Sequence, residues 1–380
     1  MNYTKNKGIL KPHEILFIAL GVFSAAIWRL SVKNSGTADF FTGTVSFFLR
    51  FILTKATYLL PFSLAEFLLF AALPLAVYLI IRFILKILRE KHGAKARLLV
   101  FAGGMVKLFA FAGCLMFVFV FTFGVCYGKT TVNEKMGFER RLLDSGDLYS
   151  AMEILISEIS AAEEKITGIS ETGSTIMPYD LKELNNKLNA AYKNMLGEYG
   201  LFRHIYSNVK PVILSEQMSK MHITGIYFPF TGEANVNVNF PDYNLPFTAA
   251  HEMAHLMGVA REDEANFTAF LVCLHSSDDY IRYSGLVNMS EYIGNALYRA
   301  NSEKYREIMG GMPKLVINEM AAYSKFFDKY RDSDVSKIAS AANDAYLRAQ
   351  GQEQGVKSYG LAVDLSVVYL LDIYNAKIAR

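Results

Sequence analysis

The stretch GEANVNVNFPDYNLPFTAAHEMAHLMGVAREDEANF, residues 232–267, decides how the second half of this chain is organised. Residues 251–255 within it are His-Glu-Met-Ala-His, the pattern H-E-x-x-H. Pro246 suits the first turn of a helix, and the alanines around the motif are good helix formers. On a helix, His251 and His255 project from one face and can bind one zinc ion, while Glu252 can accept a proton from the water that zinc activates. The pattern therefore predicts a zinc site on a helix.

A catalytic zinc site needs a third protein ligand and an open position for water. Gly258 can end the first helix, and Glu262 and Asn266, four residues apart, then lie on one face of a second helix. We expect Glu262 to be the third ligand and Asn266 to hydrogen-bond a histidine ring or its loop from outside the ligand set. The other candidates for the third ligand are Glu264, His275 and Glu233.

Two short strands are predicted before the motif, at residues 225–230 and 233–239, joined by Thr231 and Gly232. The second alternates strictly, with alanine and valine on one face and asparagine on the other. This alternation predicts an edge strand with one buried and one exposed face. An extended peptide could pair with such an edge. The residues expected on this substrate strand are Glu233, Asn235 and Asn237.

The stretch 278–285, DDYIRYSG, offers donors for the negative charge that develops on a tetrahedral intermediate. Tyr283 is the candidate from this group. Residues 148–166 and 181–199 are predicted to form amphipathic scaffold helices. The later helices, up to residue 378, are too charged to cross a membrane and are expected to complete an α-rich domain.

The first third of the chain has a different composition. Residues 1–128 hold 14 Lys/Arg and 4 Asp/Glu, whereas residues 129–380 hold 25 and 32. Three apolar runs, at about 15–32, 63–85 and 98–127, are long enough to be transmembrane helices. The chain is therefore expected to consist of a transmembrane region, residues 1–128, and a second domain, residues 129–380.

The orientation follows from the basic loop at residues 82–97, because loops rich in Lys and Arg stay in the cytoplasm. The basic amino terminus, which includes Lys5 and Lys7, then also lies inside, and with three spans the second domain lies outside the membrane. Residues 40–60 are ambiguous. Arg50 and Lys55 favour an interfacial or re-entrant segment over a fourth span, which would invert the arrangement.

Composition also excludes several classes of protein. Cys114 and Cys126 lie in an apolar run and Cys273 stands alone, so no disulfide framework is available. A net acidic second domain does not suit a nucleic-acid-binding surface, which needs clustered basic charge. The apolar runs make the lipid bilayer an expected partner, and the predicted zinc site and strand make a peptide or protein substrate another.

The stretch 232–267 resembles an uncharacterised bacterial membrane family, domain of unknown function 3810, as do PFSLAE at residues 61–66 and VKSYGLAVDL at residues 356–365. More broadly, H-E-x-x-H followed by E-x-x-A-N is similar to the zinc peptidases called gluzincins. That resemblance implies His251, His255 and Glu262 as ligands and Glu252 as general base. The short spacing from His255 to Glu262 departs from gluzincins. It resembles the metzincin pattern, except that Arg261 stands where a histidine would.

The sequence thus predicts three transmembrane helices followed by a mostly helical α+β, zincin-like domain with a small sheet. The expected function is that of a zinc metallopeptidase anchored in the bacterial cell membrane with an extracytoplasmic catalytic domain. The alternatives are a non-catalytic zinc-containing sensor or assembly module, which would need no Glu252, and a hydrolase of non-peptide amides or esters. The sequence leaves the substrate and the oligomeric state open.

Overall fold

The computed structural model describes residues 10–330, 334–349 and 362–378. Lys5, Lys7 and residues 356–361 lie outside these ranges. The contacts divide the chain into an N-terminal unit, Met1–Leu49 and Leu64–Lys129, and a C-terminal unit, Arg50–Ser63 and Thr130–Arg380. This division differs from the expected one, because Arg50–Ser63 belongs to the C-terminal unit.

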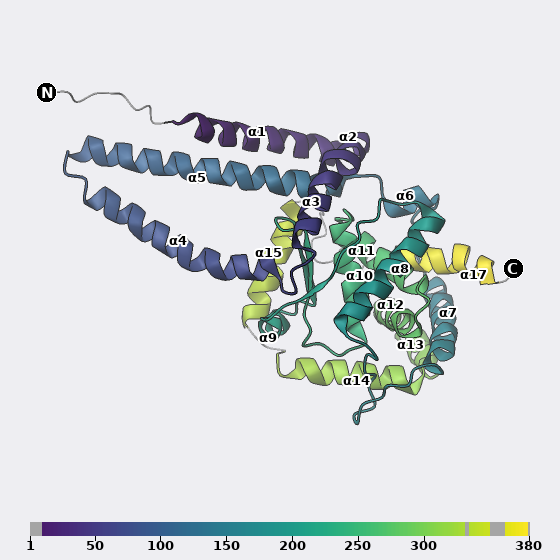
Figure 1. The fold of residues 1–380 in the computed structure, drawn as a ribbon. Helices are drawn as coiled ribbons and strands as arrows, with labels where there is room; N and C mark the ends of the chain where they lie inside the picture. Colours follow the sequence, from purple (N-terminus) through teal and green to yellow (C-terminus); the bar gives the residue numbers. More distant parts are fainter. Residues whose placement is uncertain (1–9, 331–333, 350–361, 379–380) are drawn as a thin grey trace. The chain divides into compact units, whose positions relative to one another are not determined.

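The N-terminal unit holds three helices that are long and apolar enough to cross a membrane. They are α1 (Pro12–Lys33), α4 (Leu64–Leu88) and α5 (Ala94–Thr122). Figure 1 shows α1 and α5 lying side by side. They approach closely at two glycines, since a Cβ added to Gly21 would lie 2.6 Å from the Cα of Gly113. Small residues permit such close packing between apolar helices. The unit also contains α2 (Ser35–Phe41), the π-helix η1 (Thr42–Ser46) and the 3-10 helix η2 (Gly124–Gly128).

The ambiguous residues 40–60 are mostly helical. Helix α3 (Phe47–Thr57) follows η1 directly and continues from the N-terminal into the C-terminal unit.

Helices make up most of the C-terminal unit. The two predicted scaffold helices are α7 (Ser145–Glu163) and α8 (Leu181–Tyr199), and each begins at an aspartate whose side chain accepts from the first-turn backbone N–H groups. The remaining helices are α6 (Val132–Met136), α9 (Ser215–Lys220), α10 (Asn244–Leu256), α11 (Glu262–Leu274), α12 (Asp279–Ala300), α13 (Ser302–Met309), α14 (Lys314–Asp328), α15 (Asp334–Ala349), α16 (Ala362–Val368), the π-helix η4 (Tyr369–Tyr374) and α17 (Asn375–Ile378).

A small sheet of three strands completes the described part of this unit. It contains β1 (Lys210–Pro211), β2 (Gly225–Phe228) and β3 (Glu233–Val236), in the order β1-β3-β2. Strand β3 pairs in parallel with β1 and antiparallel with β2. The expectation that residues 233–239 form an edge strand is therefore wrong: β3 is the central strand, and β2 lies at an edge.

Helix α10 lies in the middle of the C-terminal unit. It contacts β2 and β3 as well as α8, α11 and α12. All thirteen residues of α11 are buried, including the three acidic residues of its first turn, Glu262, Asp263 and Glu264. Buried carboxylates are paired with cations or bind metal ions. The partners of these three side chains therefore indicate whether a metal site lies at the start of α11.

Candidate metal centre

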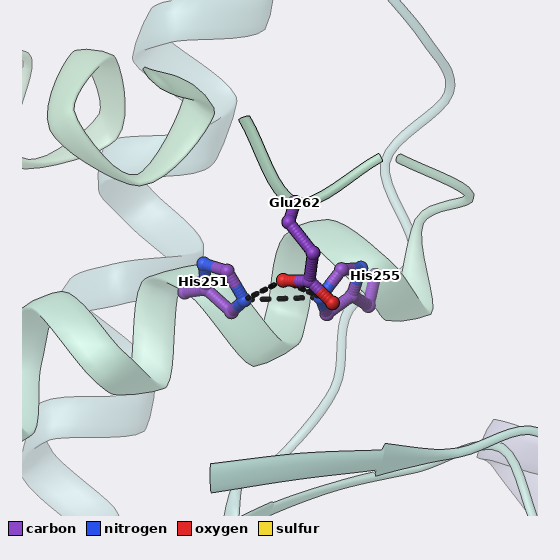
Figure 2. A group of neighbouring side chains, drawn as sticks. All are labelled: His251, His255 and Glu262. Carbon is purple, nitrogen blue, oxygen red and sulfur yellow. Dashed lines mark hydrogen bonds and ion pairs between the residues drawn. The ribbon is translucent and has the colours of Figure 1, made fainter. Parts of the chain in front are cut away.

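Helix α10 carries the H-E-x-x-H motif, as the sequence predicts. Glu262 is the first residue of α11, and Figure 2 shows the rings of His251 and His255 facing its carboxylate. The two Nε2 atoms are 3.0 Å apart. The Oε2 atom of Glu262 lies 3.2 Å from Nε2 of His251 and 3.4 Å from Nε2 of His255. Among the described residues, these three form the group that can hold a metal ion.

The distances fit tetrahedral zinc. Zinc binds imidazole nitrogen and carboxylate oxygen at about 2.0–2.2 Å, and two such ligand atoms at a tetrahedral angle are then roughly 3.3 Å apart. The three separations in the cluster bracket this value. The side chains therefore need little movement to hold an ion, and the residues present fit the metal that the motif implies.

The turn after α10 sets the orientation of His255. Gly258 has a φ of 89°, a conformation that glycine adopts without strain. The N–H of Gly258 donates to the carbonyl of His255, and that of Val259 donates to the carbonyl of Ala254, which is the Schellman arrangement. The same turn brings the carbonyl of Val259 to 2.7 Å from Nδ1 of His255. Nδ1 then carries the proton, and Nε2 is available as a ligand.

The electrostatics of the cluster favour a cation. Burial lowers the pKa of His255, but the charge on Glu262 outweighs this effect and raises the pKa of His255 to about 9. Burial raises the pKa of Glu262, but the two histidines outweigh this effect and lower it below its usual range. A positive charge between the two rings and the carboxylate is thus stabilised by the arrangement.

Glu252 is fixed beside the cluster by the edge strand β2. A Cβ added to Gly225 would lie 2.6 Å from Cγ and Oε1 of Glu252, so only glycine leaves room for this carboxylate. The backbone of Tyr227 hydrogen-bonds Glu252, and burial raises the pKa of the carboxyl. Its Oε2 atom is buried without a hydrogen-bond partner in the part of the chain that the structure describes.

The other candidates for the third ligand have different partners. Oε1 of Glu264 lies 3.3 Å from Arg261. Nε2 of His275 lies 3.0 Å from Glu198. Glu233 forms a buried ion pair with Lys210, with 2.8 Å between Nζ and Oε1. None of the three lies in the cluster with His251 and His255.

Asn266 and Tyr283 also differ from what the sequence suggests. Asn266 is buried, and within the described ranges its side chain interacts with Tyr292, whereas its amide nitrogen donates to neither a histidine ring nor the loop. Tyr283 is fully buried on α12 beside Tyr280, and burial together with Glu319 raises its pKa. The contacts that the described residues make with Tyr283 do not include His251, His255 or Glu262.

The asparagines of the expected substrate strand are buried as well. The Asn235 amide donates to the carbonyl of Ile226, and the Asn237 amide donates to Ser219 and to the carbonyl of Ile223. These side chains hold neighbouring segments together. They present no polar face to a peptide.

Two residues near the cluster were missed from the sequence. Gly225 could have been noticed, because a glycine within a strand often marks a close approach of another group. Tyr292 on α12 packs on Phe247 of α10, with ring centroids 6.4 Å apart. Its pKa is raised mainly by burial, and Glu262 is among the charges that add to the shift. No spacing or composition distinguishes Tyr292 from the other tyrosines of this chain.

The family model described as "Protein of unknown function (DUF3810)" matches residues 42–367. The chain belongs to this family. No curated protein and no solved structure matches it. Both Arg50–Ser63 and the metal cluster lie within the matched residues, so the family model covers the C-terminal unit nearly completely.

Proposed function

We propose that this protein is a zinc metallopeptidase anchored in the bacterial membrane, with a zincin-like catalytic unit. The observation that carries the proposal is the position of Glu252, buried beside three side chains spaced for zinc and held there by a strand that has no side chain at Gly225. A site that only stores or senses zinc needs ligands but no such base.

His251, His255 and Glu262 would hold the ion. When bound, zinc supplies a Lewis acid that polarises a carbonyl and lowers the pKa of water. Glu252 has one carboxylate oxygen without a partner among the described residues. In this proposal that oxygen accepts the proton of the attacking water and then delivers it to the nitrogen of the leaving amine. The pKa of Glu252 is raised by burial, which suits a group that both takes and gives a proton.

Strand β2 is the better candidate for binding a substrate. Strand β3 is paired on both sides, whereas β2 pairs with β3 alone in the described sheet and touches Glu252 through Gly225. An extended peptide added to β2 would satisfy its own backbone hydrogen bonds beside the base. This geometry supports a peptide or protein as the substrate.

Tyr292 replaces Tyr283 as the candidate donor to the developing oxyanion. It is a neighbour of α10, and the charge of Glu262 acts on it. Because burial keeps its phenol protonated, it can donate a hydrogen bond to negative charge near the ligands.

The membrane arrangement is also part of the proposal. The three candidate spans and the basic residues between α4 and α5 support a cytoplasmic amino terminus and an extracytoplasmic C-terminal unit. The catalytic centre would then act on peptides or proteins outside the cytoplasm.

The test compares the full-length wild type with Glu252→Gln and Glu262→Gln in detergent, and measures zinc content, thermal unfolding and cleavage of a peptide library. Wild type and Glu252→Gln should each hold one zinc per chain, and Glu262→Gln should hold less. Cleavage by Glu252→Gln should fall about 10²–10⁴-fold, the usual effect of losing a general base. A chelator should abolish wild-type cleavage, and added zinc should restore it.

Two results would contradict the proposal. Equal cleavage by wild type and Glu252→Gln would exclude Glu252 as the base. Full zinc retention in Glu262→Gln, with normal unfolding, would remove Glu262 from the ligand set. If wild type binds zinc and cleaves neither the library nor the membrane proteins of its host, the non-catalytic module becomes the better account.

A further inference from the structure

Most of the polar residues of helix α3 are buried, Lys55 excepted, whereas several of its apolar residues are exposed. Within the C-terminal unit, Arg50, Thr54 and Thr57 are buried, with exposed fractions of 1%, 3% and 4%. Phe51 and Ile52 on the same helix are exposed, at 40% and 59%. A helix on the surface of a water-soluble domain shows the opposite distribution.

The buried polar face of α3 is bonded to the rest of the C-terminal unit. The hydroxyl of Thr54 donates to the carbonyl of Gly232, 3.0 Å away. Nζ of Lys210 donates to the carbonyl of Thr57 at 2.5 Å. The guanidinium of Arg50 lies against the turn between His255 and Glu262, since a Cβ added to Gly258 would be 2.7 Å from its Nη2. The outward direction of the apolar residues is therefore fixed by contacts with the rest of the unit.

Other apolar residues of the C-terminal unit are exposed as well. Leu59 and Phe62 are exposed in the segment that follows, at 85% and 44%. Ile213, far away in the sequence, is 80% exposed and lies three residues after Lys210, whose Nζ bonds to Thr57. We call these five residues the outer apolar surface: Phe51, Ile52, Leu59, Phe62 and Ile213.

A cluster of Lys55, Tyr58 and Tyr206 adjoins this surface. Nζ of Lys55 donates to the carbonyl of Tyr206 at 3.0 Å and lies 5.1 Å and 5.6 Å from the ring centroids of Tyr58 and Tyr206. Lysines that extend along aromatic rings, and tyrosines themselves, are typical of the level of the lipid headgroups.

We propose that the outer apolar surface contacts lipid and seats the C-terminal unit on the bilayer. The chain itself supports this occupant, because Ser63 is followed at once by α4, one of the helices able to span a membrane. Leu59 and Phe62 are thus within a few residues of a candidate span, and Ile213 follows three residues after Lys210, which bonds to α3.

The turn at Gly258 contacts Arg50 of α3, the helix that carries part of this surface. The proposal therefore places His255 and Glu262, on either side of that turn, close to the bilayer. This placement does not depend on the reaction that the site catalyses.

The chain offers a direct test because Trp28 is its only tryptophan. In full-length protein with Trp28→Phe, single tryptophans are introduced by Ile52→Trp, Leu59→Trp and Ile213→Trp. The matched control is Tyr298→Trp, at an aromatic position of α12 that is 57% exposed. Each variant is reconstituted in phosphatidylcholine vesicles with bromines at shallow or deep positions of the acyl chain. Zinc content and thermal unfolding verify the fold.

Loss of fluorescence at positions 52, 59 and 213, with none at position 298, is the expected result, and position 213 should respond more to shallow than to deep bromines. No quenching at position 213 in folded protein would overturn the proposal. A position-213 emission that is unquenched and shifts on dilution of the protein in the vesicles would assign the surface to a second copy of the chain. Quenching does not depend on catalysis. The proposed lipid contact can therefore be supported or contradicted independently of the peptidase proposal.

Discussion

At the scale of single residues, the arrangement depends on Gly225 as much as on the H-E-x-x-H motif. The carboxylate of Glu252 occupies the space that a side chain at position 225 would need. A methyl group there must displace either Glu252 or the backbone of β2. The ligand atoms of His251, His255 and Glu262 are not in that space.

Gly225→Ala should therefore separate catalysis from metal binding. We expect the variant to keep its zinc and to lose cleavage by about 10²–10⁴-fold, as if the base itself were removed. Gly197→Ala on α8 is the control, because an added Cβ there meets nothing within 4 Å. It should cleave normally and unfold at the same or a slightly higher temperature, since alanine is favoured over glycine within a helix. A normal rate in Gly225→Ala would show that Glu252 is not confined by β2.

At the scale of elements, the cluster of His251, His255 and Glu262 was predictable and its surroundings were not. The spacing of His251, His255 and Glu262 already implies a common site, because helix geometry and one glycine turn fix where these residues can lie. The alternating asparagines of residues 235–239 suggested an exposed face, but Asn235 and Asn237 are buried. Alternation shows that two faces differ in polarity, but buried asparagines that bond to neighbouring backbone satisfy the same pattern. Tyr292 depends on the packing of α12 on α10, which no local pattern encodes.

Helix α3 was difficult for a related reason. Its composition, apolar with Arg50 and Lys55, is compatible with a span, a re-entrant segment or an interfacial helix. What the sequence does not reveal is that the hydroxyls of Thr54 and Thr57 have partners at residues 231 and 232. These contacts make α3 a structural part of the C-terminal unit.

A fragment that begins at residue 130 should therefore be less stable than one joined through a flexible linker to a copy of residues 47–63. The matched control carries Thr54→Val and Thr57→Val in that copy, which removes two hydroxyl donors and keeps the volume. Each lost hydrogen bond costs about 1 kcal/mol. For a domain of this size the control should melt roughly 4–8 °C below the joined fragment. Equal melting temperatures for all three proteins, measured with zinc present, would show that α3 contributes nothing to the stability of the unit.

At the scale of the whole molecule, the proposed orientation of the C-terminal unit rests on charge and apolar length together. If the three candidate helices all cross the membrane, the proposed arrangement has the basic residues between α4 and α5 on one side and the acidic C-terminal unit on the other. Cysteine labelling can test this directly. Cys114, Cys126 and Cys273 are first replaced, and single cysteines are then introduced by Glu171→Cys and Ala94→Cys, both at exposed positions.

A membrane-impermeant maleimide applied to cells, or to spheroplasts if an outer membrane blocks it, should label position 171 and spare position 94. Position 94 should react after the cytoplasmic membrane is permeabilised, which confirms that its thiol is accessible. The proposed orientation predicts this pattern because the six Lys and Arg residues between positions 82 and 97 resist translocation. The reverse pattern would mean that the helical segment containing α3 crosses the bilayer as a fourth span. The metal centre would then face the cytoplasm, and its substrates would have to be sought there.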